Sequence, residues 1–171
     1  PMLQACGATN DPDVLYYHQA MKADDKDHFL ESMVKEFTDQ WDNGNFVPVR
    51  KSTLSDEEKK QVLPAVWAMR RKRKLLTGEI YKWKSRLNLD GSKQVEGRDF
   101  WQTYAPVATW GSIRLQLTLA LLQGWHTKQI DFVQAYPQAP IEVTQYLKWP
   151  KGIEVDGYNP DEWVLKVEKN V

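Results

Sequence analysis

The sequence is poor in the residues that form covalent cross-links or metal clusters. Of its 171 residues, one is a cysteine, Cys6, and three are histidines, His18, His28 and His126. A single cysteine excludes an internal disulfide and a cluster of metal-bound thiolates. The histidines lie far apart in the chain, so we expect no histidine-ligated metal centre.

The sequence also lacks a long apolar run. No stretch approaches the length needed to cross a bilayer, and the first residues do not follow the pattern of a signal peptide. We therefore expect a soluble, intracellular protein without a membrane partner. The chain begins with Pro1 and stops at "VEKNV", directly after a strand-like run. This suggests a piece of a longer protein.

A net charge is absent as well, because 23 basic residues balance 23 acidic ones. The charges are nevertheless segregated along the chain. Between Met69 and Leu87 there are eight Lys or Arg residues and one acid, Glu79, whereas the stretch 24–42 is mostly acidic. Opposed patches of this kind favour one face that binds a polyanion.

The first half of the chain predicts helices and strands after an irregular lead-in over 1–23. Apolar residues recur every four positions in 24–42 and predict an amphipathic helix, which Asp24 or Asp25 can cap and Asn43-Gly44 can end. The segment 45–50 resembles an edge strand because it contains a proline. Ser55 and Glu58 have the spacing of a capping box, which predicts a short helical turn.

Two basic strands, 65–74 and 79–89, are expected to form a hairpin. In the second, Ile80, Lys82, Lys84 and Arg86 fall on one side, with Tyr81, Trp83 and Leu87 mostly on the other. The cations of both strands can converge on one face and hold phosphates. The residues concerned are Arg70, Arg71, Lys72, Arg73, Lys74, Lys82, Lys84 and Arg86. A solvated, merely solubilising face is the alternative, and Trp67, Tyr81 and Trp83 can be core residues or stacking surfaces.

The second half predicts a loop over 90–106 and an apolar helix over 110–124 that ends at Gly124. Because the helix is apolar nearly all round, we expect it to be buried. Strands are expected over 125–132, 144–150 and 162–169, with a tight turn over 133–140.

Asp131 is a single carboxylate at the predicted end of the strand 125–132. A carboxylate beside a cleft suits magnesium, which proteins hold through one or two carboxylates together with substrate phosphates. A turn-capping role explains a lone aspartate equally well, since metal-assisted phosphoryl transfer needs carboxylates from at least two chain segments.

The order of several short motifs resembles the reverse transcriptase of copia-type long-terminal-repeat retrotransposons. The similarity runs from about residue 26 to the C-terminus and includes the helix "FLESMVKEF" and the strand "VWAMRRKRK". The motifs are Lys84-Ser85-Arg86-Leu87, Gly97-Arg98-Asp99-Phe100, Ala105-Pro106-Val107, Ser112-Ile113-Arg114 and Asp131 to Tyr136.

The resemblance implies an α+β fold, that of a right-hand polymerase, with antiparallel hairpins and packed helices. Residues 24–110 would form the fingers region and 111–171 the first part of the palm, with a palm sheet backed by the helix near Ser112 to Gly124. It implies a metal site for Mg²⁺ or Mn²⁺ at Asp131, with the backbone carbonyl of Phe132 as a further ligand.

The resemblance also implies roles for the neighbouring residues. Gln134 and Ala135 would approach the incoming deoxynucleoside triphosphate, and Tyr136 would clash with a 2′-hydroxyl. Lys84 and Arg86 would neutralise the triphosphate, with the leading one of the two left open. The implied partners are an RNA template, a DNA primer and the remainder of a polyprotein with the rest of the palm, the thumb and an RNase H region, in a cytoplasmic virus-like particle.

The sequence departs from the family pattern in one decisive respect. The Tyr-x-Asp-Asp motif that supplies the other catalytic carboxylates does not occur in these 171 residues. We therefore expect the chain alone not to polymerise, and we expect poor solubility from an unpaired sheet edge at the Asp131 strand. Two alternatives stay open: a nucleic-acid-binding module without chemistry, and an α+β interaction domain.

Overall fold

The protein is described by a computed structural model in which residues 11–101, 107–132 and 140–169 are placed. It has an α+β fold with two sheets. The elements in chain order are β1 (Val14–Leu15), α1 (Tyr17–Ala20), α2 (Lys26–Asp42), β2 (Phe46–Arg50), α3 (Asp56–Lys60), β3 (Val62–Leu63), β4 (Ala65–Arg73), β5 (Ile80–Leu89), α4 (Trp110–Gln123), β6 (Pro140–Lys148) and β7 (Trp163–Lys169).

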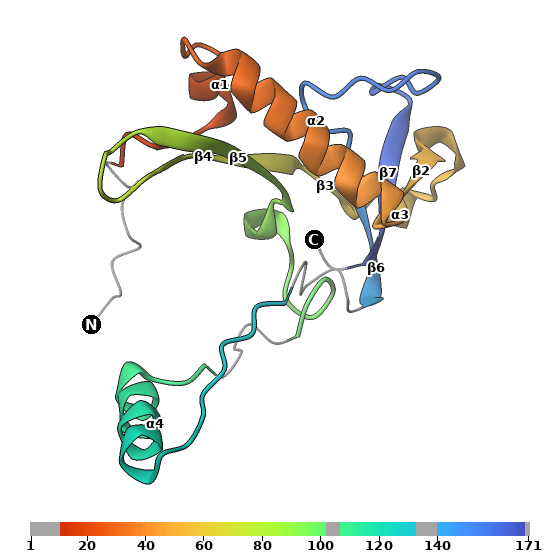
Figure 1. Cartoon of the computed structure of the whole chain (residues 1–171). Helices are drawn as coiled ribbons and strands as arrows, with labels where there is room; N and C mark the ends of the chain where they lie inside the picture. The colour runs from red at the N-terminus through yellow and green to blue at the C-terminus, as the bar shows by residue number, and fades with distance from the viewer. Residues whose placement is uncertain (1–10, 102–106, 133–139, 170–171) are drawn as a thin grey trace, which may run out of the picture.

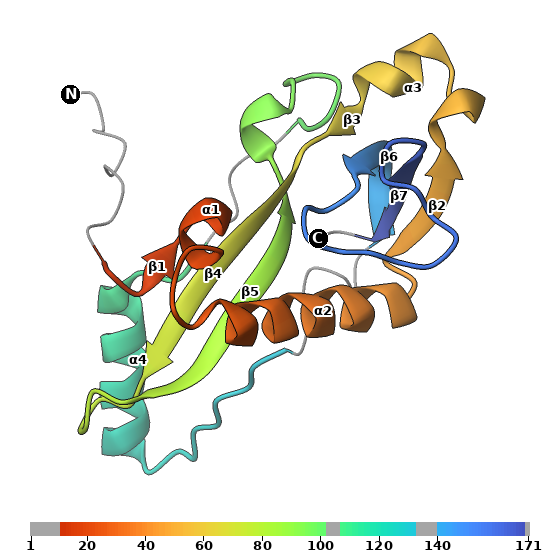
Figure 2. The same ribbon diagram turned by 90° about the horizontal axis from the view of Figure 1, so that it is seen from above.

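The first sheet has the strand order β1-β4-β5 and is antiparallel throughout. Strands β4 and β5 form the long hairpin that the sequence predicted, and α2 crosses one face of it (Figures 1 and 2). The register shifts between Lys72 and Arg73, which leaves Tyr81 without a partner in β4. The predicted alternation along β5 therefore holds from Lys82 onward and does not extend to Ile80.

The second sheet has the order β2-β7-β6-β3 and is mixed, because the short β3 runs parallel to β6. Strand β2 lies at an edge, as predicted from Pro48, which cannot donate a backbone hydrogen bond. The capping box also formed as predicted. The Ser55 amide donates to the Glu58 carboxylate at 2.8 Å, and the Glu58 amide donates to the Ser55 hydroxyl at 3.2 Å.

A single core joins both sheets to α2. Phe29 and Met33 from α2, Trp67 from β4, Leu147 from β6 and Leu165 from β7 belong to the same buried cluster. The core contains residues that precede α4 in the chain and residues that follow it. The segments 11–101 and 140–169 therefore pack against one another.

Helix α2 ends where the sequence predicted, since Gly44 follows its last turn with a φ of 64°. Its start differs from the expectation. Asp25 occupies the N-cap position, but its side chain makes no capping hydrogen bond. The carboxylate contacts the β4–β5 hairpin instead, so its role is tertiary.

The lead-in predicted to be irregular contains structure between residues 14 and 20, and the prediction was wrong there. Val14 and Leu15 pair with Arg70 and Met69 of β4, and the short α1 follows directly. Two residues are too few for period-two alternation to be visible, so only the edge of β4 gives this strand its conformation.

Helix α4 formed over the predicted residues, but the expectation that it is buried was wrong. Leu115, Leu117, Leu121 and Leu122 are between 54% and 83% exposed, and Ala120 is the buried residue of the helix. The helix lies on the side of the β4–β5 sheet opposite to α2 and stands apart from both sheets (Figures 1 and 2). Apolar character signals that a surface needs a partner, and within the described residues neither sheet supplies one.

The predicted strand over 125–132 did not form either. This segment is extended but pairs with no strand in the described part of the chain, and Ile130 and Phe132 are 75% and 67% exposed. The predicted palm sheet backed by α4 is therefore absent from the described residues. The predicted turn over 133–140 falls outside them, apart from Pro140 at the start of β6.

Within the placed ranges, no helix combines the length and the apolar character that crossing a membrane requires.

Candidate nucleic-acid interface

The β4–β5 hairpin carries a row of cations on the face turned away from α2, here called the outer face. Because side chains alternate along paired strands, residues directly opposite one another share a face. Arg70 is opposite Lys84 and Lys72 is opposite Lys82, while Arg86 follows on the same side, opposite Ala68. The outer face thus consists of Arg70, Lys72, Lys82, Lys84 and Arg86, as the sequence predicted for these five.

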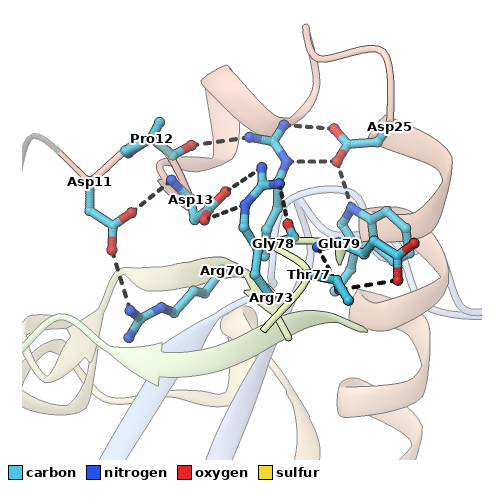
Figure 3. A network of polar contacts seen from close by, with 11 residues as sticks. Asp11, Pro12, Asp13, Asp25, Arg70, Arg73, Thr77, Gly78 and Glu79 are labelled. Atoms are coloured by element: carbon cyan, nitrogen blue, oxygen red, sulfur yellow. Dashed lines mark hydrogen bonds and ion pairs between the residues drawn. The ribbon is translucent and has the colours of Figure 1, made fainter. Parts of the chain in front are cut away.

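Arg71 points to the opposite, inner face, since it lies opposite Trp83. It is engaged in an ion pair with Asp25, the acid labelled in Figure 3. Its guanidinium donates two hydrogen bonds of 2.7 Å to the Asp25 carboxylate, and the Trp83 indole donates a third at 2.5 Å. These donors, Arg71 foremost, hold the pKa of Asp25 far below its ordinary value although burial opposes the shift. Both side chains are less than one-fifth exposed, so the pair is shielded from water.

Arg73 and Lys74 are also paired with acids. Arg73 donates to the Asp13 carboxylate at 2.8 and 3.0 Å and to the carbonyl of Gly78 at 2.9 Å. Lys74 donates to Glu79 at 3.0 Å across the hairpin turn. The prediction that all eight basic residues converge on one side therefore requires correction. Period-two alternation sends Arg71 to the inner face, and nearby carboxylates engage Arg73 and Lys74.

The outer face has little neutralising charge of its own. Asp11 approaches Arg70 at 3.3 Å, in a pair that is largely open to water. The pKa of Lys84 is lowered, first by partial burial and then by repulsion from Arg86 and Lys72. A lysine that is disfavoured in its charged form by neighbouring cations marks a surface on which an anion would be stabilised.

A hollow of ≈ 560 Å³ lies beside these cations. Its basic wall is formed by Arg70, Lys72, Lys84 and Arg86. Its other lining residues are largely apolar and come from β1, from the residue that follows it, and from β4: Val14, Leu15, Tyr16, Val66, Trp67, Ala68 and Met69. Strand β1 was not predicted from the sequence, and so the apolar wall was missed.

Asp131 follows α4 in the chain, outside any helix or strand. Its side chain is exposed and has no hydrogen bond or ion pair to any residue in the described ranges. The structure therefore does not bring Asp131 into contact with Lys84 or Arg86. Gln134, Ala135 and Tyr136 lie outside the described residues, and their predicted roles are untested.

Comparison with known proteins gives the family of the chain. Residues 52–171 match the family described as reverse transcriptase (RNA-dependent DNA polymerase). The chain belongs to this family. The match covers more than two-thirds of the sequence and includes the hairpin, α4 and Asp131.

Curated relatives of this reverse transcriptase chain are retrovirus-related Pol polyproteins of plant transposons. The chain is 32% identical over 94 residues to that of transposon RE2 from Arabidopsis thaliana, which is 55% of the chain and 6% of the relative. It is 26% identical over 149 residues to that of transposon TNT 1-94 from Nicotiana tabacum, which is 86% of the chain and 10% of the relative.

These relatives confirm the predicted resemblance to reverse transcriptases of copia-type elements. The matched part is at most one-tenth of either polyprotein. No solved structure matches the chain significantly.

Reverse transcriptases generally use divalent metal ions, and Asp131 offers a suitable oxygen ligand. Its carboxylate is exposed and unpaired among the described residues, so it is accessible to a hard cation. In the placed ranges, no three His, Cys, Asp or Glu side chains are grouped so that they could hold a metal ion. Asp131 thus fits one position of a magnesium site, and the described residues do not complete that site.

The reverse transcriptase motif Gly97-Arg98-Asp99-Phe100 contains a buried carboxylate, Asp99, and contacts the second sheet. The sequence did not suggest this structural role. Asp99 is 5% exposed and accepts hydrogen bonds from the Val95 amide at 2.7 Å and from Arg98 at 2.7 and 2.8 Å. These donors keep the pKa of the Asp99 carboxyl low. Gln145 of β6 donates to the Asp99 carbonyl at 3.1 Å, which ties the loop after β5 to the second sheet.

Proposed function

We propose that this chain is part of an RNA-directed DNA polymerase of a copia-like retrotransposon. The family match carries the proposal, and the outer face supports it, because a row of cations on a sheet with little neutralising charge is suited to phosphates. In the complete enzyme, the primer 3′-hydroxyl attacks the α-phosphorus of a deoxynucleoside triphosphate and pyrophosphate leaves. An RNA template directs the choice of nucleotide.

The shared core suggests how the chain divides between polymerase subdomains. Segments 11–101 and 140–169 pack into one body and would form the fingers, whereas 107–132, with α4 and Asp131, would belong to the palm. This division differs from the one expected from the sequence, in which the fingers end and the palm begins at residue 110. The reason is that β6 and β7 share the core of α2 and the hairpin.

Lys84 and Arg86 are proposed to bind the phosphates of the incoming nucleotide or of the nucleic acid. Positioning and charge neutralisation provide most of the catalysis in phosphoryl transfer, so cations that form no ion pair within the described part of the chain are suited to this role. Gln134, Ala135 and Tyr136 are proposed to contact the nucleotide, with Tyr136 excluding a 2′-hydroxyl.

Asp131, together with the backbone carbonyl of Phe132, is proposed to supply oxygen ligands to Mg²⁺ or Mn²⁺. The bound ion neutralises charge on the transferring phosphoryl group. The remaining carboxylates would come from other parts of the Pol polyprotein, along with the thumb and an RNase H region. The complete protein would act inside the cell, in a virus-like particle.

The experiment that tests the proposal uses a complete Pol polyprotein that contains this chain. The variant Asp131→Asn should reduce magnesium-dependent primer extension to background, because the ligand charge is lost while the side-chain shape is kept. Asp156→Asn, an exposed aspartate in the loop before β7, is the matched control and should leave extension unchanged. Wild-type extension by the Asp131→Asn enzyme would contradict the proposal.

The isolated chain is proposed to be inactive in primer extension for lack of the other carboxylates. A nucleic-acid-binding module without chemistry is the second candidate, favoured by the outer face alone. Such a module would bind single strands through its cations and would be indifferent to Asp131→Asn in the complete polyprotein.

A further inference from the structure

We propose that the hollow beside the outer face binds an unstacked base of a single-stranded nucleic acid, with Tyr16 as the stacking surface. The inference rests on the proposed function, since it assigns a ligand to the same basic face. It concerns a segment outside the residues that match the reverse transcriptase family, because that match begins at residue 52.

The two walls of the hollow differ in chemistry. Arg70, Lys72, Lys84 and Arg86 line one part with positive charge, and Val14, Leu15 and Tyr16 line another with apolar and aromatic surface. Free phosphate would use only the first. A nucleotide has both an anionic backbone and an apolar base face, and proteins that bind single strands combine cations with aromatic side chains in this way.

Tyr16 is exposed and has a defined orientation. Its side chain is 58% exposed, and its ring lies nearly parallel to that of His18, with centroids 5.9 Å apart and an interplanar angle of 7°. The Tyr16 amide donates to the Gln19 side chain at 2.8 Å, and its carbonyl accepts from the amides of Gln19 and Ala20 at 3.0 Å. One ring face is supported by His18, so little freedom is lost when a base covers the other.

Contacts of Arg71 and Arg73 with the residues before β1 hold Tyr16 in this position. Asp13 pairs with Arg73, and its carbonyl accepts from the Arg71 amide at 2.8 Å. Arg71 also donates to the carbonyl of Pro12 at 3.1 Å. These contacts fasten the segment before β1 to β4. Arg71 and Arg73, which do not belong to the outer face, therefore help to position the apolar wall of the hollow that contains Tyr16.

The tryptophans of the hairpin do not offer a comparable surface. Trp67 is 4% exposed, and its indole donates to the carbonyl of Lys151 at 2.9 Å. Trp83 stacks on His28 at 4.0 Å and donates to Asp25. Tyr81 is 54% exposed but does not line the hollow. Among the aromatic rings of the described residues, Tyr16 is therefore the one that combines exposure with a place beside the cations.

A single strand is favoured over a duplex for a geometric reason. Base faces are covered by neighbouring bases in a duplex and become available only when a nucleotide is unstacked. A ring that needs a base face thus selects a strand that is not paired.

The test compares two ligands of about ten nucleotides, oligo(dT) and an abasic strand of the same length, by fluorescence anisotropy with the whole chain. Wild-type protein should bind oligo(dT) more tightly than the abasic strand. Tyr16→Ala should weaken oligo(dT) binding roughly 5- to 100-fold and leave the abasic strand unaffected. Tyr16→Phe should retain the preference, because a phenyl ring stacks as well as a phenol.

Tyr81→Ala is the matched control and should change neither affinity. An oligo(dT) preference that survives Tyr16→Ala, or is absent from the wild type, would overturn the inference. Failure of the proposed function is distinguishable from this outcome. In that case Asp131→Asn would leave primer extension by the complete polyprotein at the wild-type level, whatever the preference of the chain for oligo(dT). Circular dichroism of each variant shows that the fold is retained.

Discussion

The two faces of the β4–β5 hairpin use the same residue types for different purposes. On the inner face, Arg71 is paired with Asp25, shielded from water and packed over the ring of Phe29 at 5.6 Å. On the outer face, Lys84 lies opposite Arg70 and repels its neighbours. A run of five consecutive basic residues thus contains both structural and ligand-binding candidates, separated by strand alternation and by the acids that approach it.

The contrast shows that the number of cations is a poor measure of a binding surface. A cation with a carboxylate in bidentate contact has already exchanged its hydration for an internal partner, and an incoming phosphate would have to displace that partner. A cation surrounded by like charges gains most from a phosphate. Four predictions test this division, and they are ordered from the largest expected effect to the smallest.

Asp25→Asn should destabilise the fold by about 2 to 3 kcal/mol, because it leaves the guanidinium of Arg71 shielded and without its counter-charge. Urea denaturation measures the loss. Asp24→Asn, at the exposed neighbouring position, should shift the free energy of unfolding by at most about 0.5 kcal/mol. Equal effects of the two substitutions would show that the inner-face pair does not stabilise the hairpin.

Acid should remove the same stabilisation in wild-type protein. The pKa of Asp25 is lowered on folding from an ordinary value of 3.8, chiefly by Arg71. Its contribution is therefore complete above that value and is lost as the pH falls below it toward the folded-state pKa. Urea unfolding of wild type and Asp25→Asn between about pH 5 and pH 2 should show their difference shrinking as the pH falls. A constant difference would refute the assignment.

The double substitution Lys84→Gln with Arg86→Gln should weaken binding of a single-stranded oligonucleotide about tenfold or more at low salt. The slope of log affinity against log salt should fall by about 1.4, since two phosphate contacts are lost. Fluorescence anisotropy at several salt concentrations measures both. Lys35→Gln with Lys59→Gln removes the same charge from exposed helix positions and should have a much smaller effect.

Lys84→Met should stabilise the free protein by a few tenths to about 1 kcal/mol, because it removes repulsion from cross-strand cations while keeping the apolar stem. Folding lowers the pKa of Lys84, so wild-type stability rises as the pH increases through that pKa. The advantage of the variant should therefore shrink at alkaline pH. Thermal unfolding at neutral and alkaline pH measures both effects, and a loss of stability in the variant would contradict them.

The sequence predicted most of the body formed by 11–101 and 140–169. Helix α2, the hairpin, the edge strand with Pro48 and the Ser55 capping box all depend on local periodicity or local hydrogen bonds. The five outer-face cations were also predictable, because alternation along a strand is a local property. The family was predicted from the order of the motifs, and the family match confirmed it.

The remaining features depend on contacts between distant residues. The pairing of Asp25 with Arg71 spans 46 positions, and that of Asp13 with Arg73 spans 60. The acids upstream of the hairpin were visible in the sequence, but nothing indicated which cation each would meet. The strand expected over 125–132 and the burial expected of α4 failed for a related reason, since each requires a partner surface and none of the described residues supplies it.

Alternation along β4 also has a genetic consequence. Exchanging lysine for arginine within the run 70–74 keeps every charge on its face. Adding or deleting one codon just before Arg70 would move each following side chain to the other face, so that the partner of Asp25 would change while the five basic residues stayed the same. Mutational tolerance should therefore be high for substitutions between basic residues on the outer face, and low for changes of length and for the loss of the two-pronged contact of Arg71.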